Sequence, residues 1–415
     1  MPSWISLPRD ILVEILCRLA VNDLLRFRCV SKGCRDLIDS PDFVKFHLSH
    51  SLKTNSHRFL IILGKSKPYS LDLDSLEIAQ VKSNSDIFTD LLQVKFPILG
   101  SCNGLIALKT NNGDDIVICN PTTKKIRKVR RPNSRTLPAG HIFVGYGFGY
   151  DPVSDDYKLV NLSQSYNQRN NKYISTTLIY SLKSGYWRKT YHETPCFPNL
   201  PFNKGNAILV NNVLHWMIDT DESKNIVAFD LTSKKFHDVP PPILQLEKTT
   251  IYLELKELGG CLWMICSRHC ESCDDSYLDI WVMKEYGIRE SWTFLWSLEM
   301  CEDVPTLWFP VAYSKCGQKV LLWFFDNQDR TDRDMLVWYN LEGKRLEDME
   351  IRDVPVPDYD RGIEVCIATL VSPTPTPAGT TTNCASLVSP TPKPAGTTTN
   401  CRPKRKRRKG KAKIV

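Results

Sequence analysis

The chain has 415 residues with 42% hydrophobic and 10% aromatic side chains, which excludes a wholly disordered protein and allows a sizeable folded interior. Its length is too great for one ordinary core unless that core is a large repeat or ring. The first residues show no basic start followed by an apolar run, and no window approaches the roughly eighteen apolar residues of a membrane helix, so we expect a soluble intracellular protein without a membrane partner.

The formal net charge of +8 is concentrated at the C-terminal end. Residues 402–413 contain nine Lys and Arg and no acidic residue, which leaves the other 403 residues near −1. A basic groove on a folded domain and a specific nucleic acid partner are therefore not expected. We interpret the run first as a nuclear-import signal for a protein of nucleus and cytoplasm, centred on Lys404, Arg405, Lys406, Arg407, Arg408 and Lys409. Salt-sensitive attraction to nucleic acid or anionic membrane, and a merely solvated tail, are the alternatives.

Residues 4 to about 48 have apolar side chains at helical spacing. Leu7-Pro8 precedes the first predicted helix, Asn22 or Asp23 can cap a second, and Ser31 can cap a third. Pro41 is expected at the start of a fourth helix. So few residues bury little surface by themselves, so some of their apolar side chains must face a partner or the next domain.

The stretch LPRDILVEILCRLAVNDLLRFRCVSKGCRDLIDSPDFVKFHL resembles an F-box at nearly every apolar position of that family. Ala20 stands where a proline is usual and Cys34 where a tryptophan is usual, and we expect docking to survive both departures. The resemblance implies binding to a Skp-type adaptor, and through it to a cullin and a RING subunit. Some of the candidate docking residues must instead be contacts between helices; the set is Leu7, Pro8, Ile11, Ile15, Leu16, Leu19, Leu24, Leu25, Val30 and Leu37.

The middle of the chain is a divergent repeat. In each unit an apolar strand is followed by a turn, and an apolar residue stands seven positions after the one at the strand's end. The units recur every 48 to 61 residues, which is typical of four-stranded propeller blades and predicts about six of them over residues 57–370. The pairs are Leu71/Ile78, Cys119/Ile126, Tyr180/Trp187, Phe229/Phe236 and Tyr339/Leu346, with Trp281/Trp292 as a sixth that has a longer turn.

A spare strand at residues 363–370 can pair with the first blade and close the ring. The phrases SCNGLIAL, CNPTTKK, GYGFGYDPVSDDYKLV and SWTFLWSL resemble the F-box-associated kelch domains of plant F-box proteins, with a further kinship to the defence-related group. The expected fold is therefore multidomain: a small all-α F-box in residues 1–48, an all-β kelch-type propeller in residues 57–370, and a disordered basic tail in residues 371–415. Within that tail, residues 370–384 recur at 387–401 with 14 of 15 positions identical.

Polar loops that join the second and third strands of five blades should gather at one face of the ring, where we expect a protein substrate to bind. These loops are residues 109–115, 163–173, 219–225, 267–277 and 326–334. Within them, the individual candidates for substrate contact are Arg169, Tyr173, His269, Arg330 and Arg333.

No catalytic motif stands in a suitable context, so we predict a non-catalytic substrate receptor without a cofactor. A cluster of Cys and His lacks the second ligand pair of a structural zinc site, and no metal is predicted for it; the cluster is Cys266, His269, Cys270 and Cys273. Fifteen cysteines in a reducing compartment are expected to be free thiols. A propeller scaffold outside any ligase, an enzyme built on a propeller, and nucleic-acid binding through the tail are the competing interpretations.

Overall fold

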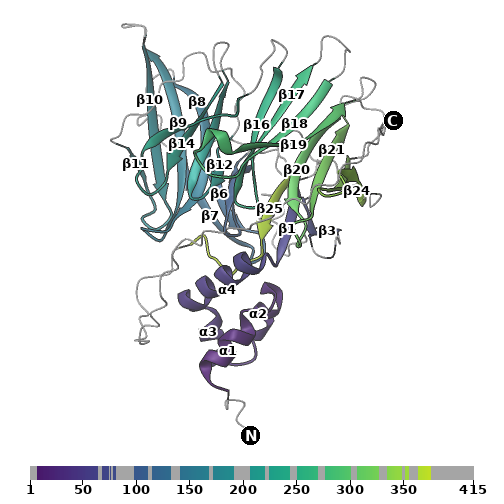
Figure 1. Cartoon of the computed structure of the whole chain (residues 1–415). Coiled ribbons are helices and arrows are strands. Elements are labelled where there is room, and N and C mark those ends of the chain that lie inside the picture. The colour runs from purple at the N-terminus through teal and green to yellow at the C-terminus, as the bar shows by residue number, and fades with distance from the viewer. Residues whose placement is uncertain are drawn as a thin grey trace. The chain divides into compact units, whose positions relative to one another are not determined.

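The computed structural model describes residues 7–63, 68–73, 75, 78–80, 98–110, 115–131, 141–167, 172–190, 206–219, 224–243, 250–269, 276–300, 306–326, 334–347, 351–354 and 363–374. All of them belong to one compact unit, residues 1–375 (Figure 1). Among the described helices, none has both the length and the apolar character that a bilayer crossing needs.

Four α-helices form the helical domain: α1 (Arg9–Leu16), α2 (Val21–Phe27), α3 (Lys32–Ile38) and α4 (Pro41–Thr54). Ser31 caps α3 as predicted, because its side chain accepts the Cys34 N–H at 3.1 Å. Ser40 caps α4 in the same way, and Pro41 is its first residue.

The predicted cap of the second helix was wrong. Helix α2 begins at Val21 with Ala20 in the N-cap position, where no side chain caps the helix, so Asn22 and Asp23 lie inside its first turn. Burial of the apolar Val21 in the helical core, where its side chain is 1% exposed, accounts for the earlier start.

Six sheets of the described strands form the blades of a ring, each counted from its innermost strand outward. The first three are β25 (Ile363–Ile367), β1 (Arg58–Leu63), β2 (Pro68–Asp72), β3 (Ile78–Gln80); β4 (Ile98–Cys102), β5 (Leu105–Lys109), β6 (Asp115–Asn120), β7 (Lys125–Arg130); and β8 (His141–Asp151), β9 (Asp156–Asn167), β10 (Lys172–Ser181), β11 (Trp187–Lys189).

The other three blades follow in chain order. They are β12 (Ile208–Val210), β13 (Val213–Asp219), β14 (Lys224–Asp230), β15 (Phe236–Val239); β16 (Thr250–Leu258), β17 (Cys261–His269), β18 (Ser276–Met283), β19 (Trp292–Met300); and β20 (Thr306–Tyr313), β21 (Lys319–Asp326), β22 (Asp334–Asn340), β23 (Arg345–Leu346). In the last blade β24 (Ile351–Val354) also pairs with β22, and a short 3-10 turn (Arg289–Ser291) precedes β19.

The spacing of seven predicted the outer hairpins of the blades correctly in five cases. Each predicted pair consists of residues directly opposite each other in the third and fourth strands, as in Cys119 opposite Ile126 and Phe229 opposite Phe236. The pairs in the first, third and last blades agree as well. In the fifth blade the pairing begins at Met283 opposite Trp292, which places Trp281 opposite Phe294 instead of Trp292.

The ring closes where the two ends of its chain meet. Strand β25 pairs antiparallel with β1, with Cys366 opposite Phe59, so the last strand completes the first blade as predicted. The pairing ends at Ile367, three residues before the predicted end of the strand. Each of the six interfaces between neighbouring blades holds its own apolar cluster, so the ring is packed all round.

Strands that alternate in direction give the ring two different faces. The turn face carries the turns between first and second strands and between third and fourth strands, such as residues 102–105, 151–156, 283–292 and 340–345. The loop face carries the connections between second and third strands. Helix α4 leads into β1 at Arg58, on the turn face (Figure 1).

Candidate functional site

The helical domain has a closed core and an uncovered apolar face. Its core contains Leu16, Val21, Leu24, Leu37, Ile38 and Phe43. Among the described residues of this domain, seven large apolar side chains are exposed; Phe46 and Leu52 belong to α4, and the five that precede α3 are Leu7 (51% exposed), Ile11 (47%), Ile15 (47%), Phe27 (41%) and Val30 (69%). We call the five residues before α3 the docking surface.

Helix α1 contributes side chains both to the helical core and to the docking surface. Leu12 and Leu16 pack into the core, whereas Ile11 and Ile15, one turn apart, lie on an exposed stripe. Apolar side chains gathered on an exposed helix face are typical of a protein interface.

The ten docking candidates divide by burial. Leu7, Pro8, Ile11, Ile15 and Val30 are exposed. Leu16, Leu24 and Leu37 are buried in the core, and Leu19 and Leu25 pack half-buried against it. Phe27 was not among the candidates; the exposed end of α2 is visible only once the helices are packed, because periodicity alone does not say which apolar face is inside.

A segment directly after the ring's last strand holds the helical domain and the ring together. We call residues Ala368–Pro373 the strap. Leu370 is part of the helical core, and Val371 is part of the cluster between the second and third blades, against which Val44 and Leu48 of α4 also pack. The strap therefore contributes to two apolar cores at once.

Polar contacts fix the strap to the turn face. Asn120, fully buried at the end of β6, donates from Nδ2 to the carbonyl oxygens of Thr369 and Val371 at 2.9 and 2.8 Å. Its Oδ1 accepts the N–H groups of Thr122 and Thr123 and so caps the following turn. One asparagine of the CNPTTKK motif thus shapes a hairpin and holds the strap.

Residues of the SCNGLIAL motif also contact the strap. Thr369 Oγ1 donates to the Asn103 carbonyl at 3.0 Å. Gly104 has φ +79°, and a Cβ there would lie 2.4 Å from the Ile367 carbonyl oxygen and 2.5 Å from Thr369 Oγ1. Only glycine permits both the left-handed backbone and this close approach.

The GYGFGYDPVSDDYKLV motif ties the third and fourth blades together. Buried Asp151 forms an ion pair with buried Lys158 and accepts hydrogen bonds from Ser154 and, at 2.8 Å, from Thr232. Burial alone would raise the pKa of Asp151, but hydrogen bonds from Lys158, Ser154 and Thr232 lower it far below its ordinary value. Asp151 is therefore a structural anion.

An ion pair reaches from the same turn to the helical domain. Lys45 Nζ of α4 lies 2.6 Å from Asp155 Oδ2, and both side chains are about half exposed. Together with the strap, this pair joins α4 to the turn face.

The predicted substrate-contact residues fall largely outside the described part. Arg169, Arg330 and Arg333 lie outside the described residues. Tyr173 and His269 lie in β10 and β17, opposite Tyr166 and Ser276, at the ends of hairpins that lead to the loop face. The five hairpins thus do point their connections to one face, as expected, while the individual contacts stay predictions.

The Cys/His cluster is not assembled in the described residues. Cys266 is buried in β17, and Cys270 and Cys273 lie outside the described residues. Over the part of the chain that the structure describes, no group of three His, Cys, Asp or Glu is arranged to hold a metal ion. The nine described cysteines are free thiols.

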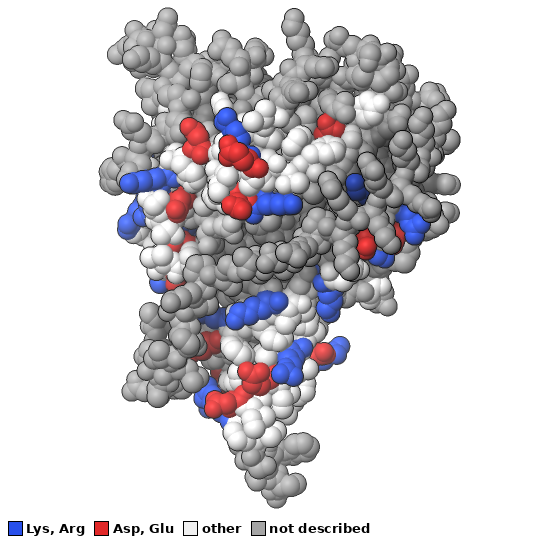
Figure 2. All heavy atoms as spheres, viewed as in Figure 1, with Lys and Arg blue, Asp and Glu red and all other residues white. Residues whose placement is uncertain are grey.

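Charged side chains inside the ring have polar partners. Lys256 and Glu254 of β16 form an ion pair at 2.6 Å, and Glu364 of β25 accepts a short hydrogen bond from Ser101 of β4. On the visible outer surface, acidic and basic residues are interspersed (Figure 2).

Two family models match the chain. The F-box associated beta propeller domain covers residues 59–366, and the F-box domain covers residues 4–46. The curated relatives include three proteins of Arabidopsis thaliana. F-box protein CPR1 is 33% identical over 84% of this chain and 86% of its own length, and F-box protein At4g22390 is 30% identical over 82% and 84%. F-box/kelch-repeat protein At3g23880 is 30% identical over 89% and 96%.

Proposed function

Because the chain belongs to the F-box proteins that carry an F-box-associated β-propeller, we propose that it is the substrate-recognition subunit of a Skp–cullin–F-box ubiquitin ligase. The F-box domain implies a Skp-type adaptor as the direct partner. The cullin and the RING subunit are reached through that adaptor. The ring then holds a protein target, so that ubiquitin is transferred at high effective concentration.

The docking surface is the single observation that carries this proposal. The helical domain is already closed inside by Leu16, Leu24 and Leu37, so its exposed apolar side chains are not needed for its own core. Burying several of them under an adaptor would supply the apolar anchors that a standard interface uses. Pro8, also exposed, borders the same stripe.

The strap supports the second half of the proposal. A substrate receptor brings a target to a distant ubiquitin-conjugating enzyme. Free movement between the helical domain and the ring would lower the effective concentration of the target at that enzyme. Leu370 packs in the helical core and Val371 in the ring's core, so the strap restricts that movement. We infer that the chain itself is non-catalytic and supplies placement, while its partners supply the chemistry.

The loop face is the proposed substrate side, because rigid hairpins present its connections together. Replacing residues 168–171 and 270–275 with glycine-serine segments should abolish capture of the target and leave the ring's melting temperature unchanged. Unchanged capture would exclude this face.

The basic run of residues 402–413 is proposed as a nuclear-import signal, and a fluorescent fusion with Lys404–Lys409 changed to glutamine should lose its nuclear fraction.

The adaptor test uses full-length protein and a purified Skp-type adaptor. Ile11→Glu/Ile15→Glu places two charges on the docking surface and should abolish co-purification, while the melting temperature stays within a few degrees because both side chains are exposed. Ile243→Glu, at a residue 77% exposed on the ring, is the matched control and should bind normally. If the double variant retains the adaptor, the ligase role fails and the chain is a propeller protein of another kind.

A further inference from the structure

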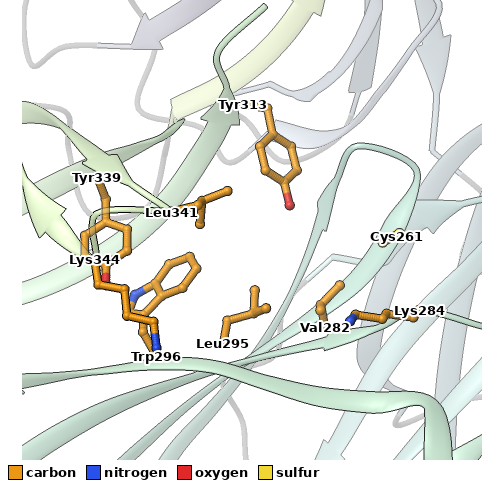
Figure 3. A pocket seen from close by; sticks show the side chains of 9 residues that line it. All are labelled: Cys261, Val282, Lys284, Leu295, Trp296, Tyr313, Tyr339, Leu341 and Lys344. Atoms are coloured by element: carbon orange, nitrogen blue, oxygen red, sulfur yellow. The ribbon is translucent and has the colours of Figure 1, made fainter. Parts of the chain in front are cut away.

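A cavity of about 310 Å³ opens between the fifth and sixth blades (Figure 3). Its lining comes from the turn-face ends of both blades: Lys284 follows β18, Tyr313 ends β20, and Lys344 lies in the turn between β22 and β23. The remaining lining residues are Cys261, Val282, Leu295, Trp296, Tyr339 and Leu341. Neither the docking surface nor the strap contributes to it.

Stacked aromatic rings make the walls of this cavity rigid. Trp296 stacks on Tyr339 with ring centroids 4.7 Å apart and an interplanar angle of 24°. Trp263, behind them, meets Trp296 edge to face at 5.8 Å and Tyr313 at 5.7 Å. Because these rings pack against each other, the cavity is largely formed before a ligand arrives.

The polar groups of the cavity are all suited to an anion. Trp296 is 6% exposed, and its indole N–H, which can only donate, has no acceptor. Lys284 and Lys344 approach from opposite sides of the cavity (Figure 3), and neither forms an ion pair with any described residue. Glu285 and Glu342 are their neighbours in sequence, but neither lines the cavity.

The other titratable groups of the lining are neutral near pH 7. Burial raises the pKa of Tyr313 to about 12, and burial also raises the pKa of Tyr339. The pKa of Cys261 is raised by burial and by the nearby Glu257 carboxylate. The lining therefore carries two positive charges and no negative one.

We propose that this cavity binds a small aromatic carboxylate, with its ring system against Val282, Leu295 and Leu341 and its carboxylate at one of the two lysines. A volume near the lower end of ligand pockets suits a compact bicyclic acid better than a peptide. Hydrogen bonds from an ammonium group to a carboxylate are stronger than neutral ones, and the uncommitted indole N–H offers a further donor.

The proposed ligand site is separate from the proposed substrate side. Its residues lie at the turn face, whereas the connections proposed to grip the target leave the opposite face. The inference does not rest on the ligase role, because it uses only residues of the fifth and sixth blades.

Calorimetric titration of the full-length chain tests the proposal with 2-naphthoic acid and its uncharged isostere 2-naphthamide as probes. The acid should bind with a Kd below about 1 mM, and the amide should bind at least about tenfold more weakly. One of the two variants Lys284→Met and Lys344→Met, the one that removes the lysine at the carboxylate, should weaken binding of the acid about fivefold, and both variants should leave binding of the amide unchanged. Lys128→Met, at an exposed lysine of β7, is the matched control and should bind normally.

The location is tested by filling the cavity. Leu341→Trp should abolish binding of both probes, and its thermal transition shows whether the ring remains folded. If Leu341→Trp misfolds, the two lysine variants decide alone. Equal binding of acid and amide, unaltered binding by both lysine variants, or absence of heat at 2-naphthoic acid concentrations of several millimolar would each overturn the proposal.

Discussion

The helical domain and the ring solve the problem of burying apolar side chains in opposite ways. The ring closes on itself, with an apolar cluster at every interface between blades and a last strand that completes the first blade. The core of the helical domain includes Leu370 from the segment after the ring's last strand, yet Ile11 and Ile15 stay uncovered. A region that is self-sufficient suits a scaffold, and a region that leaves an apolar stripe exposed suits a partner.

The largest expected effect lies in the ring. Asp151→Ala leaves Lys158 buried without its counter-ion and should lower the free energy of unfolding by about 3–5 kcal/mol, measured by urea denaturation. The double variant Asp151→Leu/Lys158→Met, which removes both charges, should recover most of that loss. A single variant that loses less than about 1 kcal/mol would show that Asp151 and its hydrogen bond from Thr232 do not hold the third and fourth blades together.

The next effect should separate the two regions. Leu370→Ala removes a side chain that is 8% exposed from the helical core and should destabilise the helical domain by about 2–3 kcal/mol while the ring is unaffected. Amide hydrogen exchange would then accelerate in α2 to α4 and stay unchanged in β12 to β15. Leu346→Ala, at a residue 43% exposed in β23, is the control; equal acceleration in both regions would mean that the strap stabilises the ring as well.

Acidification should weaken both regions through one buried histidine in each. Burial lowers the pKa of His215 in the ring to about 4, and burial also lowers the pKa of His47 in α4, whose Nε2 lies 3.0 Å from the Leu19 carbonyl oxygen. Because the unfolded chain takes up these protons near pH 6.5 and the folded chain does not, stability is complete above that pH and falls below it.

For His215 the loss should reach about 2 kcal/mol between pH 7.5 and pH 5. The measurement is urea denaturation at both pH values for the wild type and for His215→Asn, which removes the titrating group. The variant should show a smaller loss by that amount, and an identical pH dependence would contradict the assignment.

The smallest effect concerns the ion pair between the regions. Lys45→Ala breaks the contact with Asp155, but both side chains are about half exposed, so the cost should not exceed about 0.5 kcal/mol. Urea denaturation of this variant beside Leu370→Ala would show whether the strap or the surface pair joins the two regions. A larger loss for Lys45→Ala would assign that role to the pair.

Much of the ring was predictable because its repeat is local. Two residues seven positions apart, such as Phe229 and Phe236, already define a hairpin, and five such pairs with a sixth that has a longer turn predict six blades. The prediction failed at Trp281, because the hairpin closes with Met283 opposite Trp292, which places Trp281 opposite Phe294. The substrate-contact candidates stay predictions, since the polarity of a loop identifies where contacts are expected and not which side chains make them.

The site was harder to predict because it depends on packing between distant segments. Periodicity identified the apolar residues of α1 and α2 but not which of them face inward, so Leu24 stood among the docking candidates and Phe27 did not. The strap was missed because Val371 and Pro373 begin a Pro- and Thr-rich stretch, and only the folded chain shows both side chains buried.

Hydrogen exchange on the full-length chain with and without a purified Skp-type adaptor tests the central claim most directly. If the adaptor binds the docking surface, protection of backbone amides from exchange should appear in residues 7–16 and 25–30 and not in the strands of the ring. Protection confined to the ring, or none in α1 at saturating adaptor, would contradict it.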